Sequence, residues 1–187
     1  MESLKEAQND FIQKEIWMLT FSAAFQRANV YKADAAAEQK KHFKNKTTGY
    51  IDNVILNNYK NGNVNDEQHI ENIKNISNYS AHFSELFNNG RINFGIAQKI
   101  LNLYLKYQWS LGNIPAPPHF PVDRIIQGEL NKHARLSGLN ALALEPWTQY
   151  PDEKHYLAVI DMARQVINKS FTKYSLAELE LELFNRR

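Results

Sequence analysis

The chain has 187 residues, of which 43% are hydrophobic and 22% are charged, and its formal net charge is +2. These values are typical of a globular protein with a hydrophobic core; they permit a local basic surface but do not require a nucleic-acid partner. The absence of cysteine excludes disulfides and also metal sites that depend on thiolates.

The sequence favours a cytoplasmic location. The first residues, Met1–Glu6, are too charged for the apolar part of a secretory signal. No apolar run reaches the roughly 20 residues that a membrane-spanning helix requires. We therefore expect a protein without membrane contact, folded as a single domain over residues 1–187.

The low content of glycine and proline predicts an all-α fold without strands. A capping box at Ser3–Glu6 predicts a first helix that ends near Asn29. The lysine-rich run at Lys40–Thr48 predicts an exposed, mobile connector. Apolar periodicity and end signals then predict helices over residues 50–59, 65–86 and 94–111. Two further helices are expected to begin near residues 121 and 151, and Ser175 is expected to cap a last short helix.

The helix predicted over residues 94–111 is apolar nearly all round, as a buried central helix should be. Its polar residues Lys99, Asn102 and Lys106 share one stripe. Two interpretations of Lys99 are open. It is either part of a solvated stripe or part of a functional site.

The segment from Asn93 to Asp123 has the layout of a site. Gly95 allows a tight turn at a helix start, where unpaired N–H groups can hold a phosphate. Lys99, placed in the first helical turn, is expected to favour its neutral, nucleophilic form because the helix dipole disfavours a cation there. Asp123, expected just after Pro121 begins a helix, is a carboxylate able to orient that amine or stabilise positive charge.

These residues resemble a known family. The sequence NFGIAQK at Asn93–Lys99 is similar to the Leu-Pro-Gly-hydrophobic-Gly-x-Lys hairpin of the helix-hairpin-helix DNA glycosylases. Phe120–Asp123, FPVD, resembles the Val-Pro-Val-Asp element of that superfamily, and the order of the two motifs is the same. Phe94 replaces the proline of the hairpin, and Ala97 replaces its second glycine.

The resemblance implies a two-lobed all-α glycosylase fold that binds DNA, extrudes a damaged base and cleaves its glycosidic bond. Lys99 would be the nucleophile of a glycosylase/lyase, and Asp123 its electrostatic and proton-handling partner. The DNA contacts within residues 91–124 would then come from a short set of residues: Gly95, Ile96, Ala97, Arg91 and Arg124. No organic cofactor is implied, although a monovalent cation often supports such a hairpin.

An alternative function remains open, namely a non-catalytic all-α protein that binds a protein partner or nucleic acid. In that case Asp123 is only a helix-start residue that favours the dipole. The six histidines show no metal-binding pair, so we expect no metal site. The distance between Lys99 and Asp123 in space discriminates between the two interpretations.

Overall fold

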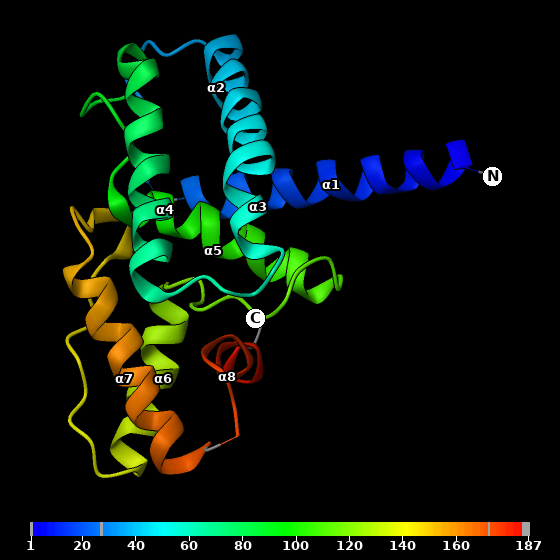
Figure 1. Cartoon of the computed structure of the whole chain (residues 1–187). Helices are drawn as coiled ribbons and strands as arrows, with labels where there is room; N and C mark the ends of the chain where they lie inside the picture. The colour runs from blue at the N-terminus through cyan, green and yellow to red at the C-terminus, as the bar shows by residue number, and fades with distance from the viewer. Residues whose placement is uncertain (1, 27, 172, 185–187) are drawn as a thin grey trace.

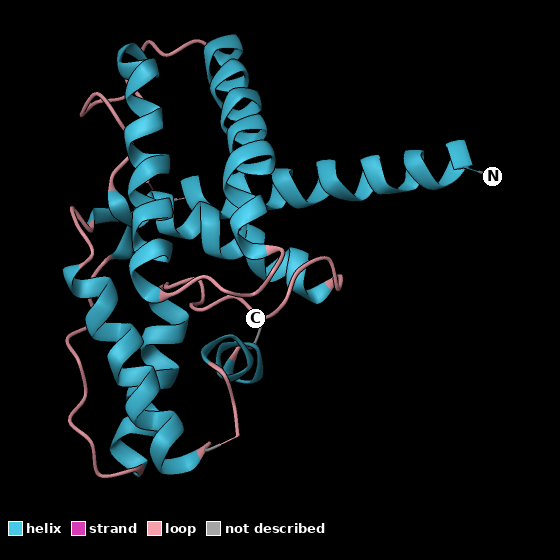
Figure 2. Cartoon of the chain, viewed as in Figure 1, coloured by secondary structure: helices cyan, strands magenta, loops and turns pink. Residues whose placement is uncertain are grey.

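The computed structural model describes residues 2–26, 28–171 and 173–184, and every regular element in these ranges is helical (Figures 1 and 2). An isolated antiparallel bridge joins Tyr31 to Phe87. The predicted all-α fold class is therefore confirmed. None of the described helices combines the length and apolar character needed to cross a lipid bilayer.

Helix α5 (Phe94–Ser110) is the central element, and its predicted bounds and burial are confirmed. Helix α1 (Glu2–Phe25) packs across it, with the Trp17 ring stacked on Tyr104 at a centroid distance of 4.1 Å. The capping box predicted at Ser3 is not formed, because Ser3 already lies inside α1. The predicted end near Asn29 is also too late, since the chain leaves the helix to form the bridge at Tyr31.

The lysine-rich run at Lys40–Thr48 lies within helix α2 (Ala37–Tyr50), so the predicted mobile connector is wrong. Phe43 and Thr47, four residues apart on one face, are both buried. The Phe43 ring packs edge-on against Phe87 at 5.0 Å. In the sequence, four lysines around this short face obscure its apolar periodicity. The helix is stabilised instead by the packing of Phe43 against aromatic rings from distant parts of the chain.

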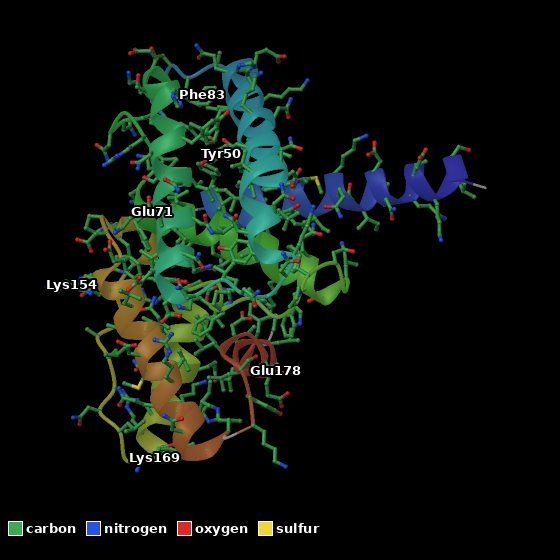
Figure 3. All side chains as sticks on the ribbon, viewed as in Figure 1. Tyr50, Glu71, Phe83, Lys154, Lys169 and Glu178 are labelled. Atoms are coloured by element: carbon green, nitrogen blue, oxygen red, sulfur yellow. The ribbon has the colours of Figure 1, made fainter. Side chains whose placement is uncertain are left out.

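Two segments complete the upper part of the molecule in Figure 1. Helix α2 continues through the π-helical turn η1 (Ile51–Ile55) into α3 (Leu56–Tyr59). Helix α4 (Asp66–Ser80) begins where predicted, with the Asn65 side chain as its cap, and is followed by the 3₁₀ turn η2 (Ala81–Leu86). Tyr50 and Phe83 lie between α2 and this second segment (Figure 3).

Three further helices pack on one another: α6 (Arg124–Leu136), α7 (Lys154–Ser170) and α8 (Leu176–Leu183). The capping box predicted at Ser175 is confirmed, with Glu178 as its second member. The predicted start of α6 near Pro121 is wrong, because Asp123 is its N-cap residue. The short 3₁₀ turn η3 (Trp147–Gln149) connects this group to α5. The two-lobed arrangement of the glycosylases stays a prediction.

Candidate functional site

The start of α5 does not expose the N–H groups predicted to hold a phosphate. Gly95 donates its N–H to the Tyr150 carbonyl at 3.1 Å, and Ile96 donates to the Asn93 side chain at 3.0 Å. The N–H of Ala97 bonds the Asn93 carbonyl at 3.1 Å. All three residues of the predicted cradle are buried. The expected phosphate contacts of Gly95, Ile96 and Ala97 are therefore corrected: the loop before α7 occupies this helix end.

Gly95 has a packing role instead. It has an ordinary helical backbone, and a Cβ on it would lie 1.8 Å from the Trp147 carbonyl oxygen. Only glycine allows so close an approach of the loop to the helix. The monovalent cation expected at this helix start stays a prediction. Among the described residues, no cluster of three or more histidine, aspartate or glutamate side chains is arranged for a metal ion.

Lys99 and Asp123, 24 positions apart in the sequence, meet in space. The Lys99 Nζ donates to Asp123 Oδ2 at 2.8 Å, and both side chains are mostly buried. Lys99 is the sixth residue of α5, beyond the first turn, so the predicted effect of the helix dipole on its amine does not apply. A solvated lysine stripe is also excluded, because Lys99 is 6% exposed and Asn102 is 0% exposed.

Asp123 has two functions at once. Its Oδ1 accepts the N–H groups of Ile125 at 2.9 Å and Ile126 at 3.0 Å, which caps α6, while Oδ2 is left for Lys99. Burial raises the pKa of this carboxyl, but the Lys99 charge and the three hydrogen bonds outweigh burial, so its pKa lies below the ordinary value. Asp123 is therefore a carboxylate at neutral pH.

The Lys99–Asp123 pair lines a cavity of about 580 Å³ between α1, α5, the start of α6 and α8. A second pair lies in the same wall, with Lys106 Nζ 2.6 Å from Glu180 Oε2. The exposed Arg124 also lines the cavity, and the Trp147 ring centroid lies 5.6 Å from Lys99 Nζ.

Arg91, which was predicted with this group, is not brought to the cavity. It lines a separate depression together with Asn29 and Thr148. Its guanidinium donates to the Asn78 side chain at 2.8 Å. The predicted DNA-binding set is thus divided between a buried helix start, the cavity and another part of the surface.

A buried polar network that the sequence did not predict supports the site from behind. Gln98, next to Lys99, accepts the Val122 N–H at 3.1 Å and donates to the Val122 carbonyl at 2.8 Å. Asn102 donates to the Gln98 side chain and to the Tyr156 hydroxyl at 3.0 Å. The amide of Gln98 thereby fixes the backbone directly before Asp123. The trace of these contacts in the sequence is that α5 carries amide side chains, Gln98 and Asn102 among them, between its apolar residues.

The network continues to the surface. The Tyr156 hydroxyl lies 3.0 Å from His119 Nδ1, and His119 Nε2 lies 3.0 Å from Asp66 Oδ1. Burial lowers the pKa of His119 to about 4, although Asp66 opposes this shift. His119 belongs to the proline-rich loop, which explains how that loop is fixed to the core.

Comparison of the chain with protein-family models, with curated proteins and with solved structures gives no match.

Proposed function

We propose that the protein is a DNA base-excision glycosylase/lyase in which Lys99 and Asp123 act on the glycosidic bond. One observation carries the proposal: two short motifs, 24 residues apart, converge to a 2.8 Å contact in the wall of a cavity. Both members of the pair have the residue types and the chain order of the family that the sequence resembles. Base excision also requires a cavity that admits an extruded nucleotide.

The proposed reaction begins with a proton transfer. The Lys99 ammonium donates a proton to the base as the C1′–N bond breaks, and the bonding electrons leave with the base. The neutral Lys99 amine then attacks C1′, which carries positive charge, and forms a C–N bond. The secondary ammonium that results passes one of its two protons, through water, to O4′ as the C1′–O4′ bond opens. This gives a protonated imine between the lysine and the sugar, and a hydroxyl group at C4′.

Asp123 stabilises the positive charge that develops on the sugar. Its lowered pKa keeps it ionised, and its hydrogen bonds to the start of α6 hold it in place before the substrate arrives. Substrate must separate Lys99 from Asp123, so the ion pair is a resting arrangement. Arg124, exposed at the cavity, is the proposed phosphate contact in place of the buried start of α5.

The test is borohydride trapping on duplexes that carry damaged bases or abasic sites. The wild type should form a covalent complex, because borohydride reduces the imine, and Lys99→Ala should form none. Asp123→Asn should trap at a rate lower by about 10²–10³-fold, since asparagine preserves the cap of α6 but removes the charge.

The matched control is Lys106→Ala, which removes the other lysine that is ion-paired in the same cavity. This variant should trap like the wild type. The proposal fails if the wild type traps no substrate, or if Lys99→Ala traps as well as Lys106→Ala.

A second candidate is a non-catalytic binding protein. The occupied N–H groups at the start of α5 favour it, because they remove the expected DNA contact. Lys106 and Glu180 show that this fold also contains an ion pair outside the motif. Absence of trapping, together with retained binding to a protein or nucleic-acid partner, would support this second function.

A further inference from the structure

The first half of α1 stands clear of the rest of the molecule (Figures 1 and 3). The side chains of residues 3–12 are all exposed. Three of the exposed large apolar side chains on α1 are Leu4, Phe11 and Met18, which are 63%, 61% and 56% exposed. A helix segment that packs on nothing is marginal in water. Leu4, Phe11 and Met18, called the stripe below, form an apolar surface that has no partner among the described residues.

The three side chains lie on one side of the helix and face away from the body. Leu4, Phe11 and Met18 are spaced by seven residues, which places them on one side of the helix within about 20° per step. Helix α1 packs on the body through buried residues such as Ile16 and Thr20. Met18 is two residues, or about 200°, from each of them, so the stripe points outward along its whole length.

We propose that this stripe binds the same stripe of a second copy of the chain, with the two α1 helices antiparallel about a two-fold axis at Phe11. The spacing is symmetric, because Leu4 and Met18 each lie seven residues from Phe11. An antiparallel dimer therefore places Leu4 of each copy opposite Met18 of the other and brings the two Phe11 rings together. A two-fold interface requires such self-complementarity.

The charges beside the stripe are also self-complementary. Lys5 and Glu15 lie on one flank, and Asp10 and Lys14 lie on the other, as their spacing of about 100° per residue shows. In the antiparallel dimer, Lys5 of one copy and Glu15 of the other are offset by only about 3 Å along the helix axis. Asp10 and Lys14 are related in the same way.

The predicted dimer is weak. From Leu4 to Met18 the stripe extends only about 21 Å along the helix, which gives an interface at the small end of specific complexes. We expect a reversible dimer with a Kd of about 1–100 µM, so its population should rise with protein concentration.

The chain has no cysteine, so engineered cysteines in the full-length protein test the arrangement directly. Under mild oxidation Phe11→Cys should form a disulfide-linked dimer, because this position lies on the axis. Leu4→Cys and Met18→Cys should each remain monomeric alone and should cross-link when the two variants are mixed. Leu136→Cys, at a site 84% exposed on α6, is the control for random collision.

Sedimentation equilibrium supplies the second measurement. Phe11→Glu should weaken the dimer at least about tenfold. Lys5→Glu should weaken it too, and the double variant Lys5→Glu/Glu15→Lys should recover the wild-type Kd. The proposal is overturned if the wild type stays monomeric above that concentration range, if Leu4→Cys alone cross-links as well as Phe11→Cys, or if the charge exchange restores nothing.

Discussion

Gly95 shows how one atom decides what a helix start does. The absence of a Cβ allows the Trp147 carbonyl to approach, and the Gly95 N–H then bonds the Tyr150 carbonyl. The same glycine that indicated an anion site in the sequence serves to dock a loop on α5. Lys99, four residues later, remains available to the cavity because it lies beyond the docked turn.

Gly95→Ala is expected to destabilise the protein by about 2–3 kcal/mol. The new methyl group meets backbone atoms of Trp147, which can move away only if the whole loop shifts. Gly128 on α6 is the matched control, since a Cβ there meets nothing within 4 Å. Gly128→Ala should stabilise by about 0.5–1 kcal/mol, the difference in helix propensity. Urea unfolding of both variants measures these changes, and equal effects of the two would contradict the docking role of Gly95.

At the scale of elements, α2 shows a helix determined by its partners. Its apolar face is short, and its lysines gave the appearance of a solvated connector. Phe43 contacts Phe83, Phe87 and Phe21 within an aromatic cluster that combines α1, α2 and η2. Burial of this ring provides the free energy that local propensity does not supply.

Phe43→Ala should therefore lower the free energy of unfolding by about 3–5 kcal/mol, as expected for an aromatic ring removed from a core. Lys41→Ala, an exposed change on the same helix, should alter it by less than about 0.5 kcal/mol. Chemical denaturation followed by circular dichroism measures both. A Phe43→Ala variant as stable as Lys41→Ala would mean that α2 contributes no core.

At the scale of the whole molecule, a buried hydrogen-bond network joins α4, α5, α7 and the proline-rich loop. It includes two histidines of zero exposure, His69 and His119, which share the Tyr156 hydroxyl. Burial is the main reason that the pKa of each histidine is lowered. Both are neutral in the folded protein at neutral pH, and protonation of either places a charge in the core.

This network predicts acid sensitivity. An unfolded histidine binds a proton near pH 6.5, whereas folded His119 does so only near pH 4. Between these values the unfolded chain binds more protons, so stability is lost as pH falls, by up to about 3 kcal/mol from His119.

Urea unfolding at several pH values from about 7 to about 4 measures this loss for the wild type and for His119→Gln. The variant should have a shallower dependence on pH, while His82→Gln, at an exposed histidine, should follow the wild type. Parallel curves for wild type and His119→Gln would show that His119 is not the group responsible.

Local patterns in the sequence were sufficient for much of the fold. The apolar periodicity of residues 94–111 predicted α5, the start of α4 was predicted near residue 65, and the capping box at Ser175 marked the start of α8. These signals work because a cap and a helix period involve atoms only a few residues apart. Asp123 was recognised as a helix-start residue for the same reason, although Pro121 displaced the predicted boundary.

The tertiary structure decided what the candidate site contains. It brought Lys99 to Asp123 across 24 residues, placed Tyr150 on the N–H of Gly95, and buried Phe43 among distant rings. None of these contacts leaves a periodic trace in the sequence, because each depends on how separate helices pack. The sequence by itself therefore determined the helical fold class and identified Lys99 and Asp123 as the candidate pair. The packing of α5 against its neighbours determined that the two side chains meet and that a loop covers the start of α5.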